Sequence, residues 1–203
     1  MAPWSQFYQL VLPSTPGATD PLMDLELCNA AIEFFRRTRS WCVWLDPIVA
    51  QAGVREYSFV LPAMATVTRI ESAMVNGDSI GIASYKDAGP LSVTDTTGQA
   101  YGSSMGTLVL ASYYPAGTQI LVQASLTPSR TATGIDDSMF ELYANDIAEG
   151  AKSRLMLIPG QPFSNEQKAG IAGTKFEDAV ATRSTESWRG RSSVRKRVRS
   201  CAF

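Results

Sequence analysis

One short stretch of the sequence has the residue types of a hydrolase nucleophile. Gly102-Ser103-Ser104-Met105-Gly106 matches the pattern G-x-S-x-G, in which a serine occupies a sharp turn between a strand and a helix. Such a serine needs a histidine as its base, and the chain contains no histidine. The flanking residues also predict a loop before the motif and a strand after it. We therefore expect a loop here and no catalytic serine.

Two pairs of adjacent carboxylates, Asp136-Asp137 and Glu177-Asp178, are the next candidates for chemistry. A general acid/base pair needs carboxylates that face each other in a cleft, whereas neighbours on a helix point apart. We expect the first pair at a helix N-terminus, where negative charge is favoured, and the second on a solvated helix face. The sequence has no phosphate-binding or dinucleotide glycine motif and no Cys-x-x-Cys pair. We predict no enzymatic activity, no cofactor and no metal site.

The composition is that of a folded protein, with 203 residues of which 45% are hydrophobic and 18% charged. We expect one domain with no membrane-spanning segment and no secretory signal, because no apolar run approaches the roughly 20 residues that a bilayer requires. Cys28, Cys42 and Cys201 are too few and too widely spaced for a disulfide framework, which favours a reducing cytoplasm. Cys28 and Cys42 fall among apolar residues and are predicted to be small core residues.

The charge is unevenly distributed along the chain. Arg183–Phe203 contains seven lysines and arginines against one acid, Glu186, whereas the other 182 residues contain 11 basic and 18 acidic groups. An acidic body with a basic end is typical of a protein that uses its tail for an interaction. The candidate binding residues of this tail are its cations and its terminal aromatic residue: Arg189, Arg191, Arg195, Lys196, Arg197, Arg199 and Phe203.

Charge composition leaves three interpretations of this tail open. It can be a solubilising end without a partner. It can bind nucleic acid, since neutralised phosphates give affinity that is independent of base sequence. It can also dock on an acidic protein surface and fold on contact, with Phe203 as an apolar anchor.

Three helices are predicted to support these residues, over residues 20–40, 137–158 and 164–184. In the first helix, Asp20 can act as the N-cap and Pro21 suits the first helical position. Its apolar stripe consists of Leu25, Cys28, Ile32 and Phe35. Glu33 and Arg37 have the spacing of an ion pair. Capping boxes are expected at Ser138/Glu141 and Ser164/Gln167. The apolar stripes of the second and third helices consist of Phe140, Ala144, Ile147, Ala151, Leu155, Ile158, Ala169, Ala172, Phe176 and Val180. Gly170 and Gly173 weaken the third helix or permit close packing.

Residues 41–127 have the period-two pattern and turn signals of strands. Asn76-Gly77 predicts a hairpin, because both central residues of a type I′ turn need positive φ. A second hairpin is expected from 108–114 to 119–126 around Pro115-Ala116-Gly117, and residues 86–106 are expected to form a long surface loop. The predicted fold is α+β: a helical bundle with an inserted antiparallel β region and an extended C-terminal tail. Its parts are a lead at 1–19, with a short helix, a domain at 20–184 and a tail at 185–203.

Five stretches in this order resemble the head-to-tail adaptor (connector) proteins of tailed bacteriophages. Their order and spacing resemble the family across about residues 4–182. The five sequences are NAAIEFFRRT at 29–38 followed by Trp41, LDPI at 45–48, LTPSR at 126–130, FELY at 140–143 continuing through IAEGA at 147–151 to Arg154-Leu155, and PGQPFS at 159–164.

The resemblance implies a structural subunit of the virion neck, made in the host cytoplasm. Such subunits form a homo-oligomeric ring, typically of about twelve copies, under the portal protein. The genomic DNA passes through the ring without specific binding, and a tail or nozzle protein occupies the other face. The C-terminal segment of such adaptors commonly inserts against the portal, which would make Arg183–Phe203 the portal-binding segment. Two alternatives stay open: a head- or tail-completion protein with other neighbours, and a nucleic-acid-binding protein that acts through its tail.

Overall fold

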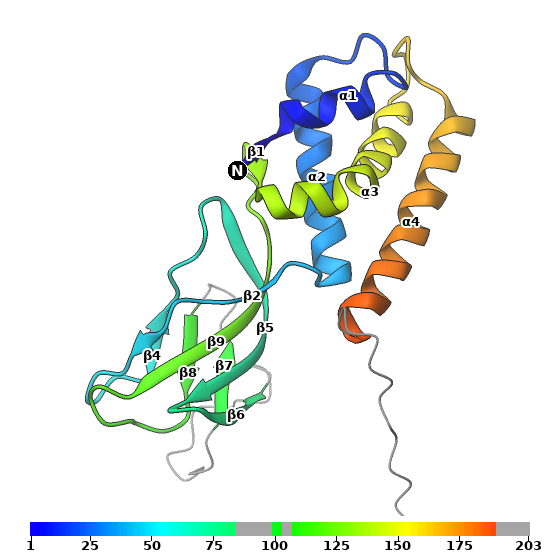
Figure 1. Ribbon diagram of the computed structural model, residues 1–203. Coiled ribbons are helices and arrows are strands. Elements are labelled where there is room, and N and C mark those ends of the chain that lie inside the picture. Colours follow the sequence, from blue (N-terminus) through cyan, green and yellow to red (C-terminus); the bar gives the residue numbers. More distant parts are fainter. Residues whose placement is uncertain (84–98, 103–106, 190–203) are drawn as a thin grey trace, which may run out of the picture.

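The structure is a computed structural model and describes residues 1–83, 99–102 and 107–189 (Figure 1). The helices gather at one end of the molecule and most of the strands at the other. The strand region lies between the first and second long helices in the chain, as the sequence predicts, and the α+β class is confirmed. The long helices are α2 (Asp20–Thr38), α3 (Asp137–Met156) and α4 (Glu166–Arg189).

The three long helices pack around a cluster of aromatic rings. The ring centroid of Phe34 in α2 lies 5.2 Å from that of Tyr143 in α3 and 6.3 Å from that of Phe176 in α4. Gly150 permits the close approach of α3 and α4, because a Cβ at this position would lie 2.7 Å from the Phe176 ring. One aromatic residue from each helix therefore fixes the packing of the helical part.

The N-terminal lead is tied to the start of α3. It consists of β1 (Ala2–Pro3), a 3-10 turn (Trp4–Phe7) and the short helix α1 (Tyr8–Val11), which agrees with the short helix expected there. β1 pairs with β10 (Gly134–Ile135), and the indole N–H of Trp4 donates to the carbonyl of Ala132 at 2.7 Å. Gly134 has no room for a side chain, because a Cβ would overlap the carbonyl of Ala2.

The strand region is one curved sheet built on two long antiparallel strands, β5 (Ala65–Val75) and β9 (Gln119–Pro128). Along the sheet the order is β2-β9-β5-β6-β7-β8-β4, and β3 also pairs with β9. The shorter strands are β2 (Cys42–Trp44), β3 (Ile48–Val49), β4 (Glu56–Ser58), β6 (Asp78–Ala83), β7 (Gln99–Gly102) and β8 (Thr107–Leu110). Residues 50–55 join β3 to β4, so the two ends of the sheet come together.

Alternate side chains of β9 form the core of the sheet. Ile120, Val122, Ala124 and Leu126 are almost fully buried, as expected for the inward face of a pleated strand. This core continues into the helices at Trp41, whose ring lies 5.5 Å from that of Phe35. The helical part and the sheet therefore share one hydrophobic core.

The Asn76-Gly77 hairpin is confirmed. Asn76 and Gly77 have φ of 50° and 90°, and the turn joins β5 to β6. The second predicted hairpin is wrong, because β8 pairs with β7 and β4, while β9 pairs with β2, β3 and β5. The turn at Pro115-Ala116-Gly117 therefore connects β8 to β9, although these two strands do not pair with each other. The predicted loop at 86–106 contains β7, although residues 84–98 and 103–106 lie outside the described part.

The buried stripe of α4 agrees with the prediction, whereas that of α2 is rotated. The stripe of α3 agrees in part, because Phe140, Ala144 and Ile158 are only partly buried. Leu25 is 55% exposed, and the buried face of α2 instead consists of Met23, Leu27, Cys28, Ala30, Ala31, Phe34 and Phe35. The lead segment and α3 lie on that face, so the helix turns its Met23 side inward. Cys28 is buried as predicted, but the expectation that Cys42 is a core residue is wrong, because Cys42 is exposed on the sheet.

The helix caps differ from those predicted. At the start of α3 the cap is Asp136, not Ser138, and its carboxylate accepts the backbone N–H of Ser138. At the start of α4 the side chain of Asn165, not Ser164, accepts the backbone N–H of Lys168. Asp20 is the first residue of α2 and is therefore not its cap. The cap residue is Thr19, whose carbonyl accepts the N–H groups of Leu22 and Met23 but whose side chain makes no capping hydrogen bond. The long helices end at Thr38, Met156 and Arg189, rather than at 40, 158 and 184. α4 therefore includes the first residues of the predicted tail.

Candidate assembly surface

The structure defines where the predicted basic tail leaves the molecule. Arg189 is the last residue of α4, and the other six candidate residues, at 191, 195, 196, 197, 199 and 203, lie outside the described part of the chain. The geometry available for this site is therefore that of its root, the last turns of α4. What holds α4 in place determines the point at which the tail begins.

Arg183 fixes the last part of α4 to α3. Its Nε donates to Asp146 at 3.1 Å and its Nη1 donates to Glu186 at 2.9 Å. The hydrogen bond that Arg183 donates to Glu186 raises its pKa most, and the one that it donates to Asp146 raises it further. The guanidinium also lies 5.8 Å from the ring centroid of Tyr143, within the range of a cation–π contact. Two residues of α3 thus hold the end of α4 through Arg183.

A second group of charges joins all three long helices. Arg37 of α2 donates to Glu33 at 3.0 Å and to Glu177 of α4 at 2.8 and 2.5 Å, which confirms the predicted Glu33–Arg37 pair. Arg154 of α3 also donates to Glu33 and lies 3.8 Å from Glu26. The hydrogen bonds from Arg37 lower the pKa of Glu177. Glu177 and Asp178 are both exposed, as predicted for a solvated helix face, and Glu177 also has a structural partner in Arg37.

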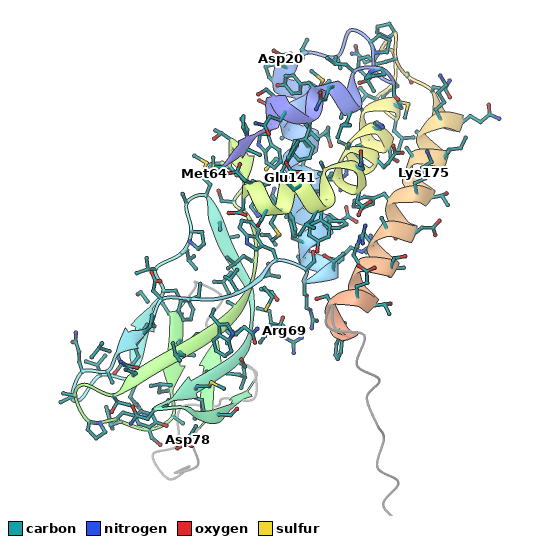
Figure 2. All side chains as sticks on the ribbon, viewed as in Figure 1. Asp20, Met64, Arg69, Asp78, Glu141 and Lys175 are labelled. Carbon is teal, nitrogen blue, oxygen red and sulfur yellow. The ribbon has the colours of Figure 1, made fainter. Side chains whose placement is uncertain are left out.

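A groove lies beside the root of the tail, between the sheet and the last turn of α4. Its volume is about 380 Å³. The side chains that line it come from the end of α2, from three strands and from α4: Arg39, Cys42, Arg69, Glu71, Gln123, Ser125, Ser187 and Trp188. Figure 2 labels Arg69 on the sheet close to the end of α4. The groove therefore brings together residues that are up to about 150 positions apart in the chain.

A direct hydrogen bond beside this groove joins the end of α4 to the end of α2. Ser187 Oγ donates to the carbonyl of Arg39 at 3.1 Å. Arg39 is the C-cap of α2 and has a left-handed φ of 52°, so its carbonyl points away from the helix that it ends. On the floor of the groove, Ser125 Oγ donates to Glu71 at 2.7 Å, and Arg69 Nε lies 3.8 Å from the same carboxylate.

Two exposed tryptophans flank the groove. Trp188 lines it and is 71% exposed. Trp44 follows Cys42 by two residues on β2, so both side chains lie on the same face of the sheet. Trp44 pairs in register with Gln123, which lines the groove, and is 49% exposed. Sequence reasoning missed this surface, because its residues come from separate elements. The available signals were Trp188 in a polar stretch and Trp44 alternating with the buried Leu45.

A smaller pocket between α3 and α4 contains three lysines, Lys152, Lys168 and Lys175, the last of which is labelled in Figure 2. Its volume is about 210 Å³. Glu149 lies in the same pocket, 2.7 Å from Lys152 and 3.9 Å from Lys175. Two of the three lysines are thus paired with the same carboxylate, which lowers the attraction of the pocket for an anion.

The remaining candidates for chemistry have structural roles or lie outside the described residues. Asp136 caps α3, and the hydrogen bonds from Ser138 lower its pKa. Asp136 is the N-cap of α3 and Asp137 is its first residue, which confirms the prediction that this pair lies at a helix N-terminus. Asp137 also binds the N-terminal ammonium group at 2.7 Å. Of the G-x-S-x-G motif, only Gly102 is described, at the end of β7. Within residues 1–83, 99–102 and 107–189, no group of three or more carboxylates and thiols could hold a metal ion.

Two comparisons place no further constraint on this surface. No protein-family model and no curated protein matches the sequence. None of the helices in the described ranges is both long enough and apolar enough to cross a bilayer.

Proposed function

We propose that this protein is a structural subunit of a head-to-tail adaptor ring in a tailed bacteriophage. In this proposal the helices form a bundle that carries the β region as an insertion and the extended tail at its end. The ring lies under the portal protein, joins it to a tail or nozzle protein and leaves a channel for DNA. The order of the five adaptor-like stretches supports the proposal.

The observation that carries the proposal is the position of the basic segment. It begins at the end of a 24-residue helix that ion pairs from Arg183 and Arg37 hold against the other two long helices. Because the segment starts at a fixed point on each subunit, several tails on one ring would act at a high effective concentration. Modest affinity of each tail for an acidic portal surface would then give lasting attachment.

The charge of the body is also compatible with a DNA channel. Residues 1–182 contain seven more acidic than basic groups. Acidic groups on a lumen would repel phosphate and let DNA move, although screening limits this effect to groups within about 8 Å of it at physiological salt. The basic tail, by contrast, would be steered towards an acidic partner before it is ordered by contact.

A binding experiment with the portal protein of the same phage tests this function. We expect replacement of Arg191, Arg195 and Arg197 by glutamine to weaken binding at least tenfold. The matched control replaces Arg36, Arg130 and Lys168, which lie on the body, and so removes the same charge without touching the tail. Equal binding by the two triple variants would contradict a portal-binding tail.

The same variants distinguish the nucleic-acid alternative. A protein that binds DNA through this tail would bind duplex DNA of any sequence, with an affinity that falls steeply as salt concentration rises. It would lose that affinity in the tail variant and keep it in the body variant. We expect the wild-type chain to bind portal far more tightly than duplex DNA at physiological salt.

A further inference from the structure

The groove beside the tail root has the composition of a protein-binding surface. Tryptophan and arginine are the residues that most often dominate binding energy at protein interfaces, and the groove region contains Trp44, Trp188, Arg39 and Arg69. Neither tryptophan packs into the core, although each could cover a large apolar area. Among the described residues, no carboxylate lies within ion-pair distance of Arg39, and Arg69 has only the 3.8 Å contact with Glu71.

We propose that this groove is the contact surface for a second copy of this chain in the ring, which binds there through an acidic part of its body. The inference rests on the proposed function and adds to it the surface through which neighbouring subunits meet. The body carries an excess of seven acids, so its surface complements the two arginines. The exposed tryptophan rings supply apolar area that the neighbour buries.

Charge excludes the basic tail of the same chain as the occupant. Gly190–Phe203 contains five basic residues and no acid, so Arg39 and Arg69 repel it. Charge also disfavours nucleic acid, because the floor of the groove holds the carboxylate of Glu71 beside only two cations. An acidic protein segment can pair with the arginines at the rim while its apolar side chains contact the tryptophans.

The same charges favour a closed ring over a two-fold dimer. In a two-fold contact centred on the groove, each groove would face that of the other copy and bring Arg39 and Arg69 towards the same residues of the partner. A head-to-tail contact instead places the groove of one copy against a different, acidic surface of the next. Head-to-tail contacts close into rings when the rotation between copies permits.

The groove contains its own reporter of occupancy. Cys42 is exposed in the groove, whereas Cys28 is only 5% exposed. Trypsin separates the three cysteines, because cleavage after Arg39 and Arg55 isolates Cys42 in its own peptide. Alkylation by N-ethylmaleimide, followed by peptide mass spectrometry, therefore measures access to the groove in the full, unmodified chain.

The test compares Cys42 alkylation in the monomer with that in the largest assembly that the full chain forms, with and without portal. We expect assembly to slow the reaction of Cys42 at least tenfold. We also expect Arg69→Glu and Trp188→Ala each to weaken self-association at least tenfold. Val60→Ser, at an equally exposed apolar position that does not line the groove, should leave self-association unchanged.

Each other outcome contradicts a defined part of the account. A ring in which Cys42 reacts as fast as in the monomer overturns this inference and leaves the proposed function standing. Protection of Cys42 in complexes that hold one copy with portal, or by a single-stranded oligonucleotide added to the monomer, assigns the groove to another occupant. A chain that never self-associates, with or without portal, overturns both proposals. Dimers with protected Cys42 support the contact and contradict the ring.

Discussion

Arg37 of α2 and Glu177 of α4 lie 140 positions apart in the chain, yet two hydrogen bonds of 2.8 and 2.5 Å join them. This pair is one of the ties that fix the direction of α4 relative to α2. The basic segment follows α4, so the pair also helps to determine where that segment starts. Both side chains are partly exposed, which limits the energy of the pair because water and salt screen it.

Replacement of Glu177 by glutamine should lower the free energy of unfolding by about 0.5 kcal/mol at neutral pH, the typical value of an exposed ion pair. The pKa of Glu177 is lower in the folded than in the unfolded state, so the contribution is present above the unfolded-state pKa and is lost as pH falls through the folded-state pKa. Urea unfolding at several pH values measures this. Asp178→Asn, at the exposed neighbouring carboxylate, is the control, and an equal effect of the two changes would contradict the role of Glu177.

The glycines of α3 and α4 should respond in opposite directions to alanine. At Gly150 a Cβ would lie 2.7 Å from the Phe176 ring and 3.2 Å from Ala30, so Gly150→Ala should cost about 1–3 kcal/mol through overpacking. At Gly170 no atom lies within 4 Å of the added Cβ, and Gly170→Ala should stabilise by up to about 1 kcal/mol through helix propensity. Thermal unfolding measures both, and destabilisation by the change at Gly170 would contradict the packing described.

The N-terminus of α4 should depend on Asn165 and not on the capping-box residue that the sequence indicates. The Asn165 side chain accepts the backbone N–H of Lys168 at 2.9 Å, so Asn165→Ala should lower the free energy of unfolding by about 1 kcal/mol. Gln167 is exposed, and Gln167→Ala should have little effect. Chemical unfolding of the two variants under the same conditions compares them. A larger loss of unfolding free energy in Gln167→Ala than in Asn165→Ala would contradict this cap and support the predicted Ser164/Gln167 capping box.

Local signals predicted those parts of the fold that local chemistry determines. The Asn76-Gly77 turn follows from its need for positive φ, and the buried stripe of α4 follows from helical period. The partners of β8 and β9 could not be predicted in this way, because these two strands are close in the chain but each pairs with other strands. The face that α2 buries is likewise determined by the segments packed on it, the lead segment and α3. No local pattern in the sequence of α2 describes these contacts.

The candidate surface was predicted only in part, for the same reason. The uneven charge identified the basic tail, since it is a property of one continuous segment. The groove forms only when Arg39, Arg69 and Trp188 are brought together by the fold. Each of these residues alone has the sequence environment of an ordinary surface residue, so composition and spacing carry no sign of their meeting.

The central claim is that this protein forms a ring under a portal. Electron microscopy of purified portal protein mixed with the full chain tests it most directly. The account predicts a ring of added density, coaxial with the portal and with an open centre, formed by many copies of the chain. Portal particles without such density, at protein concentrations well above those needed for assembly in the cell, would contradict it.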